Sequence, residues 1–179
     1  MPEPSFLNPL NIIDSLPITE GMQVAEFGSG TGLFSLATAQ RVGRDGKVYA
    51  IDVQRDTLEG LRSRARLDGT FNIEVMWADL ERAGVLKISE NALDAVLVPN
   101  MLFQSQKKDA ILQEAHRIAK KGGIVAILDW YPEKAIFGKA MGWPVEPAAM
   151  RAIAEKAGLV YVRDLQTSSV YHYGLLFRK

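Results

Sequence analysis

Short apolar segments alternate with helical patterns over most of this chain. Five segments rich in Val and Ile are bounded by turn residues or polar breaks, which is typical of β-strands. The five segments are 22–27, 47–52, 72–77, 93–98 and 123–130. The last two are apolar almost continuously, as in parallel strands that are covered on both faces. Apolar positions with helical spacing in 33–42 and 109–121 complete repeated strand–helix units, so we expect a doubly wound α/β sheet.

The last quarter of the chain has a different pattern. Residues 146–158 indicate a helix that ends at Gly158, and two strand-like segments, 159–167 and 170–178, follow it. Only Ser168 and Ser169 separate these segments, so they are expected to form an antiparallel hairpin. The prediction is a mostly parallel, seven-stranded sheet that closes with a C-terminal antiparallel pair.

Composition narrows the class of protein. The chain has 179 residues, of which 47% are hydrophobic and 23% charged, so we expect a single globular domain over 1–179. Its formal net charge is zero, so no overall field favours nucleic acid or anionic lipid. The N-terminus lacks the basic and apolar regions of a signal peptide, and no apolar run is long enough to span a membrane, so a cytoplasmic location is expected. The absence of cysteine excludes disulfides, zinc–thiolate sites and thiol nucleophiles.

A glycine-rich loop follows the first predicted strand. Gly28, Gly30 and Gly32 lie between that strand and the next helix, where backbone N–H groups can meet a ligand. The dinucleotide fingerprint G-x-G-x-x-G places its third glycine one residue later, at the position that Leu33 occupies here. The loop therefore favours a cofactor other than a nicotinamide dinucleotide.

The order of motifs along the chain resembles the class I S-adenosylmethionine-dependent methyltransferases, which have a Rossmann-like sheet. The stretches "AEFGSGTG", "VYAIDVQ" and "MWADLE" are similar to the family's first three motifs, and "LDAVLVPNMLF" to the fourth. The resemblance implies that Glu26 lies near the methionine moiety, Asp52 near the ribose hydroxyls and Asp79 near the adenine amino group. The cofactor-binding residues that it implies are Glu26, Gly28, Ser29, Gly30, Gly32, Asp52, Val53, Ala78, Asp79, Leu80 and Asn100.

The chemistry of these residues favours the same cofactor. S-adenosylmethionine carries no phosphate, and the first three strand ends supply Glu26, Asp52 and Asp79 but no Lys or Arg. Asp52 alone would suit the ribose of a nicotinamide cofactor equally well. Asp79 could instead cap a turn, whereas a carboxylate such as Glu26 inside an apolar strand is rarely buried without a partner.

Residues after the fourth and fifth strands are the candidates for binding a methyl acceptor, because ligands of such sheets bind beyond the strand ends. The candidates are Met101, Leu102, Phe103, Asp129, Trp130, Trp143, His172 and Tyr173. For His172 and Tyr173 a place in the core is the alternative. Residues 131–144, with Phe137, Met141 and Trp143, are interpreted as a lid, and plain core packing of Trp143 is the competing interpretation.

The motifs most resemble methyltransferases of quinone-biosynthesis and arsenite type, so a small-molecule acceptor and direct methyl displacement are expected. Methylation of arsenic relies on cysteines in that family, and this chain has none. No metal is expected, because only Asp129 remains of the acids that a catechol-binding metal site uses. "PNML" is not the tetrad of nucleic-acid amino-methylating enzymes. Two alternatives stay open, a non-catalytic S-adenosylmethionine-binding module that acts through a partner and an NAD(P)-dependent oxidoreductase.

Overall fold

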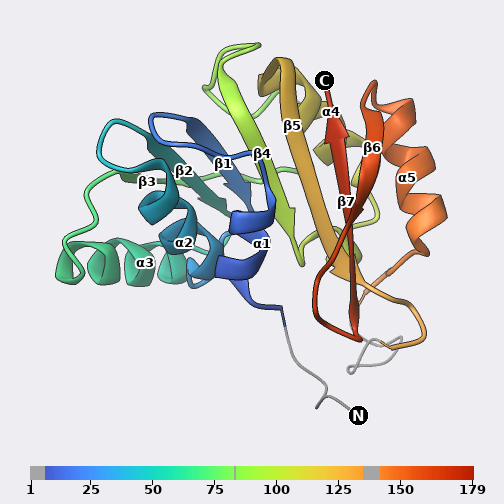
Figure 1. The fold of residues 1–179 in the computed structure, drawn as a ribbon, viewed down its shortest axis with the longest axis horizontal. Coiled ribbons are helices and arrows are strands. Elements are labelled where there is room, and N and C mark those ends of the chain that lie inside the picture. Colours follow the sequence, from blue (N-terminus) through green and yellow to red (C-terminus); the bar gives the residue numbers. More distant parts are fainter. Residues whose placement is uncertain (1–6, 83, 135–141) are drawn as a thin grey trace.

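A seven-stranded sheet forms the centre of the protein. The computed structural model describes residues 7–82, 84–134 and 142–179, and the strands lie in the order β3-β2-β1-β4-β5-β7-β6 (Figure 1). Strands β1 to β5 run parallel, and β7 is antiparallel to both β5 and β6. The strands are β1 (Gln23–Phe27), β2 (Lys47–Asp52), β3 (Ile73–Trp77), β4 (Leu93–Pro99), β5 (Ala119–Trp130), β6 (Val160–Leu165) and β7 (His172–Arg178). The predicted fold class is confirmed.

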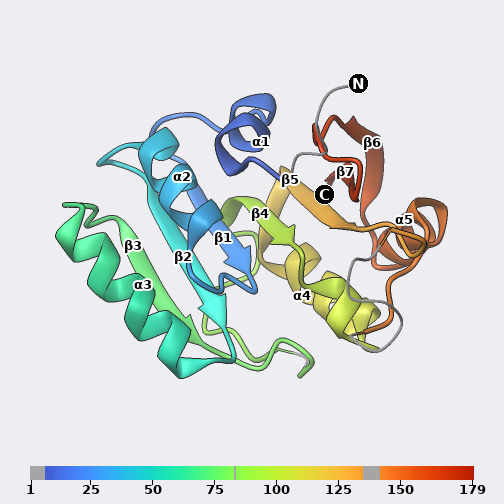
Figure 2. The same cartoon turned by 90° about the horizontal axis from the view of Figure 1, so that it is seen from below.

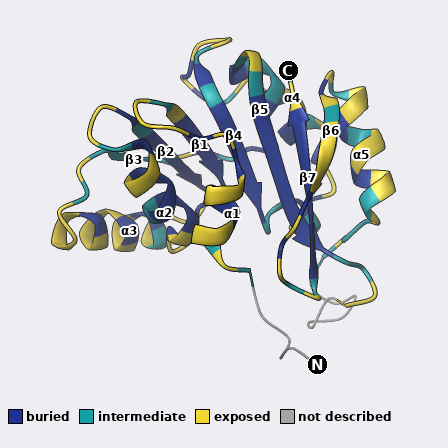
Figure 3. Ribbon diagram, viewed as in Figure 1, coloured by how far each residue is buried: buried dark blue, intermediate teal, exposed yellow. Residues whose placement is uncertain are grey.

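Helices cover both faces of the sheet, as Figure 2 shows from below. One apolar cluster packs α1 and α2 against the sheet, and a second packs α4 and α5 against the opposite face. The central strands are buried between these layers, and the outer faces of the helices are exposed (Figure 3). The helices are α1 (Pro9–Ser15), α2 (Leu33–Val42), α3 (Arg55–Leu67), the short 3₁₀ helix η1 (Leu102–Gln104), α4 (Lys108–Ile118) and α5 (Pro147–Lys156).

The strand order places a ligand crevice at one edge of the sheet. The chain adds β2 and β3 on one side of β1 and then returns to place β4 on the other side. Helices that follow neighbouring strands on either side of this switch diverge, which leaves room beyond the carboxyl ends of the strands. The segments after β1, β2, β3 and β4 therefore meet at the same edge. No helix of the described residues is long and apolar enough to cross a membrane.

The predicted helix 109–121 is wrong at its C-terminal end. Helix α4 ends at Ile118, and Ala119, which already has an extended backbone, pairs with Leu93 as the start of β5. The N–H of Gly122 donates to the carbonyl of Lys179 (2.8 Å), so this segment continues the sheet. The lysines that resemble a helix C-terminus lie in a strand, because pairing with two neighbouring segments outweighs local helix preference.

The prediction also placed the last two strands too close together. They are antiparallel as expected, but residues 166–171 connect them. The hydroxyl of Thr167 donates to the carbonyl of Ser169 (3.1 Å), and the Ser169 hydroxyl accepts from the N–H of Tyr171 (3.2 Å). These hydroxyl bonds satisfy backbone groups in place of the strand ladder and end both strands early.

Candidate functional site

The glycine loop after β1 is fixed to the neighbouring strand. The N–H groups of Gly28 and Ser29 both donate to the carbonyl of Ile51 in β2, at 2.8 and 3.0 Å. Gly28 has φ +72°, and a Cβ atom there would lie 2.7 Å from Cγ of Met101, after β4. Only glycine meets both conditions, because other residues avoid this backbone conformation and any side chain would collide. The loop thus packs tightly between β2 and the segment after β4.

Asp52 ties this loop to the end of β2. Its Oδ2 accepts from the N–H of Gly30 (2.8 Å), and its Oδ1 accepts from the N–H of Gln54 (2.8 Å). The side chain is nearly buried, at 8% exposure, yet it lines the cavity described below. Each oxygen of a carboxylate can accept more than one hydrogen bond, so Asp52 can shape the loop and still accept from a ligand hydroxyl.

Glu26 is a buried carboxyl group in the wall of the same cavity. It is 2% exposed in the middle of the sheet, paired with Ala50 and Leu97, and its Oε2 accepts from the Ser35 hydroxyl. Burial raises the pKa of Glu26 to about 8, an effect that the Ser35 hydrogen bond opposes and the charge of Asp52 adds to. Glu26 is therefore mostly neutral at pH 7, and a ligand cation beside it would favour the charged form.

The segment after β3 forms the opposite wall. Asp79 accepts from the N–H of Glu81 through Oδ1 (3.1 Å), and Ala78 and Leu80 are both buried. Oε1 of Glu81 accepts from the Ser105 hydroxyl (2.7 Å), which links this wall to the segment after β4. Asp79 thus caps a turn, which was the alternative interpretation of this residue, and it also lines the cavity.

Two polar atoms of the cavity wall are buried without a hydrogen-bond partner. They are Oγ of Ser29 in the glycine loop and Oδ1 of Asn100 directly after β4. Asn100 also has φ +50°, a backbone conformation that non-glycine residues rarely adopt. Unpartnered polar atoms and unusual backbone angles cost free energy and gather at ligand sites, so both atoms fit a site that binds a polar ligand.

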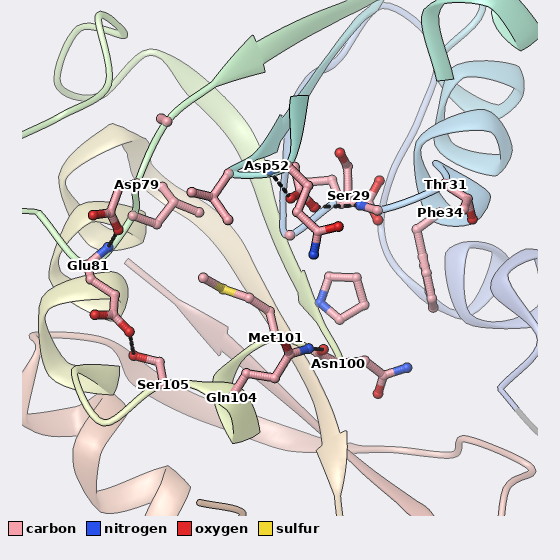
Figure 4. A pocket seen from close by; sticks show the side chains of 18 of the residues that line it. Ser29, Thr31, Phe34, Asp52, Asp79, Glu81, Asn100, Met101, Gln104 and Ser105 are labelled. Carbon is pink, nitrogen blue, oxygen red and sulfur yellow. Dashed lines mark hydrogen bonds between the residues drawn. The ribbon is translucent and has the colours of Figure 1, made fainter. Parts of the chain in front are cut away.

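These segments enclose a cavity of about 580 Å³, which is the size of a small-molecule site (Figure 4). None of the described residues that line it is Lys, Arg or His. The lining residues are Glu26, Gly28, Ser29, Gly30, Thr31, Leu33, Phe34, Asp52, Val53, Gln54, Ala78, Asp79, Leu80, Glu81, Pro99, Asn100, Met101, Gln104 and Ser105. A phosphate-bearing ligand would meet no cationic side chain among these described residues, whereas a ligand with hydroxyl, amino or ammonium groups would meet four carboxyl groups.

The residues predicted to bind the cofactor line this cavity together, except Gly32. Gly32 directly precedes α2 and has φ +82°, and a Cβ there would lie 2.1 Å from Cδ1 of Leu61, so this glycine serves the packing of α2 on α3. Sequence reasoning missed eight lining residues, namely Thr31, Leu33, Phe34, Gln54, Glu81, Pro99, Gln104 and Ser105. Most of these eight residues lie next to predicted strands or motif residues in the sequence, and this position could have identified them.

The residues predicted to bind the acceptor lie mostly outside the cavity. Met101 lines it, whereas Phe103, which is partly exposed, and Trp143, which is exposed, do not. The other five are buried in the packing of the sheet, and they are Leu102, Asp129, Trp130, His172 and Tyr173. Of the predicted lid, residues 135–141, which include Phe137 and Met141, lie outside the described part of the chain.

His172 shows why these side chains are buried. Strand β7 places it opposite Trp130, and the two rings lie 3.9 Å apart between centroids. Its Nδ1 lies 2.8 Å from the Ser169 hydroxyl, and burial lowers the pKa of His172 to about 4. Tyr173 points to the other face, where its hydroxyl donates to the carbonyl of Val145 (3.1 Å). Both side chains take part in packing, as the alternative interpretation expected.

Comparisons with known proteins point in the same direction as the geometry. A family model described as a methyltransferase domain matches residues 18–162. An arsenite methyltransferase of Aquipseudomonas alcaligenes is 28% identical over 125 residues, which are 66% of this chain and 36% of that protein. A ubiquinone/menaquinone biosynthesis C-methyltransferase of Neisseria meningitidis is 31% identical over 118 residues, which are 66% of this chain and 46% of that protein. The chain thus spans less than half the length of these curated relatives.

A solved structure has the same fold over nearly the whole chain. The crystal structure of a SAM-dependent methyltransferase from Aquifex aeolicus is 25% identical and superposes with a TM-score of 0.84. The match covers 96% of this chain and 89% of the other. Since the match extends to both ends of the sheet, the antiparallel strand pair is part of the shared fold.

Proposed function

This chain belongs to the methyltransferase domain family, whose cofactor is S-adenosylmethionine, and we propose that it transfers a methyl group to a small, non-anionic organic molecule. The observation that carries the proposal is the cavity at the strand ends, where carboxyl groups from β1, β2 and the segment after β3 converge and none of the described lining residues is cationic. Such a cavity fits the ammonium, hydroxyl and amino groups of the cofactor, and an acceptor that brought further negative charge beside these carboxyl groups would be disfavoured.

The residues present fit the ammonium, ribose and adenine groups of S-adenosylmethionine. Glu26 would hold the methionine ammonium, whose charge favours the carboxylate form of this buried acid. Asp52 would accept from the ribose hydroxyls while it holds Gly30, and Asp79 would accept from the adenine amino group. The unpartnered Oγ of Ser29 and Oδ1 of Asn100 offer further hydrogen bonds.

The protein's part in the proposed reaction is to position the acceptor. The bound cofactor supplies a methyl group on a positively charged sulfur, which is electrophilic enough for direct displacement. The segment after β4 supplies Met101, Gln104 and Ser105 to the cavity and is the wall left for the acceptor once the three carboxyl groups hold the cofactor. Alignment of two reactants in this way can lower a barrier by about 7–11 kcal/mol.

The acceptor is expected to be a carbon, oxygen or nitrogen nucleophile of an organic molecule. One relative is named for arsenite and another for quinone biosynthesis, and trivalent arsenic is a thiol-seeking element. This chain contains no cysteine, which disfavours arsenite as its acceptor. Hydroquinones, phenols and amines are therefore the classes that we propose first.

A transfer assay with methyl-labelled S-adenosylmethionine tests the proposal. Hydroquinones, phenols, amines and arsenite are offered to the wild type, each organic acceptor beside an analogue that carries an added carboxylate. We expect labelled product with a neutral or cationic acceptor, a loss of at least about tenfold with its acidic analogue, and none with arsenite. Preference for the acidic analogues, or product from arsenite alone, would contradict the proposed acceptor class. The Glu26→Gln variant is the control for turnover at this cavity.

A further inference from the structure

A hydrogen bond joins the cavity wall that follows β3 to the wall that follows β4. The Ser105 hydroxyl donates to Oε1 of Glu81 (2.7 Å), and both residues line the cavity (Figure 4). The other carboxyl groups of the cavity, Glu26, Asp52 and Asp79, each have a proposed contact with the cofactor, and Glu81 has none. A side chain that binds one wall from the other helps to set the shape of the site.

Ser105 is a fixed point of the wall after β4. It is 3% exposed, its N–H donates to the carbonyl of Leu102 (3.0 Å), and its carbonyl accepts from Nζ of Lys108. Its hydroxyl accepts from the N–H of Lys107 (2.9 Å). Because this bond uses the hydroxyl oxygen as an acceptor, the single hydroxyl hydrogen remains for Glu81. Contacts within its own segment therefore hold Ser105 in place as a donor.

Glu81 in turn holds the carboxyl group of Asp79. The N–H of Glu81 donates to Oδ1 of Asp79 (3.1 Å), in a turn where the N–H of Arg82 donates to the Asp79 carbonyl (3.1 Å). The bond to Oδ1 fixes how the carboxyl group is turned, and a carboxylate still has lone pairs for a ligand amino group. Without the bond to Ser105, the partly exposed Glu81 side chain would gain rotamer freedom and the turn would lose its link to the opposite wall.

The second contact of the Glu81 carboxyl group is weaker. Its Oε2 lies 3.9 Å from Nζ of Lys107, and the two side chains are 39% and 61% exposed. Ion pairs between exposed side chains contribute little, because solvent screens them and ordering two long side chains costs entropy. The buried Ser105 hydroxyl is therefore the contact that determines where the Glu81 carboxyl group lies.

We propose that Glu81, held by Ser105, is a positioning residue for Asp79 and makes the cavity select a base that carries an amino group. Asp79 makes the contact with the ligand, and Glu81 acts through Asp79. An amino group donates to a carboxylate, whereas a base with a carbonyl oxygen at the same place presents a second acceptor. A carboxyl group held in one orientation distinguishes these bases better than one that can turn away. The inference rests on the proposed function, in which Asp79 contacts the adenine amino group.

Calorimetric titration with two nucleosides tests this arrangement. The probes are S-adenosylhomocysteine, which is the cofactor without its transferred methyl group, and S-inosylhomocysteine, which has a carbonyl oxygen in place of the adenine amino group. The wild type should bind the first at least about tenfold more tightly than the second. In Glu81→Ala, affinity for S-adenosylhomocysteine should fall about fivefold, while affinity for S-inosylhomocysteine should change by less than about twofold.

Further variants separate the hydrogen bond from other effects of the substitution. Glu81→Gln keeps a carbonyl oxygen that can accept from Ser105, so its affinity for S-adenosylhomocysteine should lie within about twofold of the wild type. Ser105→Ala should match Glu81→Ala, and the double variant should bind no more weakly than either, because the two side chains share one interaction. Glu74→Ala is the matched control, since Glu74 is an exposed glutamate of β3 that pairs with Lys47 (2.6 Å) and does not line the cavity. It should bind both nucleosides as the wild type does.

Equal losses for the two nucleosides in Glu81→Ala would show a purely structural role and overturn the proposal. Additive losses in the double variant, or an affinity of Glu81→Gln as low as that of Glu81→Ala, would overturn it as well. A wild type without preference between the two nucleosides would contradict the contact of Asp79 with adenine, and this inference with it. None of these titrations needs a methyl acceptor, so a failure of the transfer assay would count against the proposed function alone.

Discussion

The cofactor side and the acceptor side of the cavity are built in different ways. On the side proposed for the cofactor, Glu26, Asp52 and Asp79 lie at or just after three neighbouring strands, and each contributes its own side chain to the cavity wall. On the side proposed for the acceptor, the segment after β4 supplies Met101, Gln104 and Ser105 to the cavity, and the Ser105 hydroxyl donates to Oε1 of Glu81 on the opposite wall (2.7 Å). A cofactor shared by many enzymes can be held by local strand-end motifs, whereas an acceptor pocket that differs between enzymes is built from side chains that distant parts of the chain bring together.

The largest expected effect on stability comes from a substitution at Gly28, where the glycine loop contacts Met101 of the segment after β4. Gly28→Ala places a Cβ 2.7 Å from Met101 in a left-handed backbone conformation, and should lower the free energy of unfolding by about 2–4 kcal/mol. Gly30→Ala is the matched control, since it shares the left-handed conformation but has no atom within 4 Å of the added Cβ. Gly30→Ala should lower the free energy of unfolding by only about 1–2 kcal/mol. Chemical denaturation measures both variants. Equal losses in the free energy of unfolding would show that close packing of Gly28 against Met101 does not restrict this position.

Glu26→Gln should affect only the cofactor side. Loss of the carboxylate should weaken S-adenosylmethionine binding by about 1.5–3 kcal/mol in a calorimetric titration. The wild-type pKa of about 8 in the folded state lies above the unfolded value of 4.5, so Glu26 costs the wild type stability as pH rises from 4.5 through about 8. The unliganded variant should therefore gain stability relative to the wild type over that range. A difference in melting temperature that does not change with pH would argue against a neutral Glu26.

Asp52→Asn tests whether a cofactor residue also supports the loop. Asparagine keeps one carbonyl acceptor but replaces the other with a donor that faces the N–H of Gly30 or Gln54. We expect a loss of about 1.5 kcal/mol in cofactor affinity and a smaller loss of stability. Thermal unfolding with and without cofactor measures both. Full stability together with full affinity would remove Asp52 from the site.

The smallest expected effect is that of Trp143→Ala on stability. Trp143 is 53% exposed, which is against the interpretation of this side chain as core packing. The substitution should lower the free energy of unfolding by less than about 1 kcal/mol, compared with about 3–5 kcal/mol for a buried tryptophan. Thermal unfolding of the variant measures this directly. A loss of about 3–5 kcal/mol would show instead that Trp143 packs in the core.

Local patterns in the sequence predicted the cofactor side and most of the fold. Strand ends and the glycine loop are contiguous signals, so Glu26, Asp52 and Asp79 could be found by position. The helix α3 was not predicted because its apolar stripe consists of only a few residues, Leu58, Leu61 and Ala65. Polar residues fill the rest of α3, but these three apolar residues recur at helical spacing, so the helix could have been predicted from the sequence.

The acceptor side could not be predicted in the same way because its contacts join distant parts of the chain. The hydrogen bond from Ser105 to Glu81 spans 24 residues, and nothing local marks either side chain. Asp129 and His172 looked accessible because they lie at strand ends, but the pairing of β5 with β7 buries both. The acceptor, the single-domain organisation and the cytoplasmic location stay predictions.

A calorimetric titration of the wild type tests the central claim most directly. S-adenosylmethionine and NAD⁺ are titrated separately into the same preparation, because a cavity whose described lining includes four carboxyl groups and no cationic side chain should distinguish them. The account predicts saturable binding of one S-adenosylmethionine per chain and no binding of NAD⁺ at the same concentrations. Binding of NAD⁺ in preference to S-adenosylmethionine, or no binding of S-adenosylmethionine by the folded chain, would contradict it.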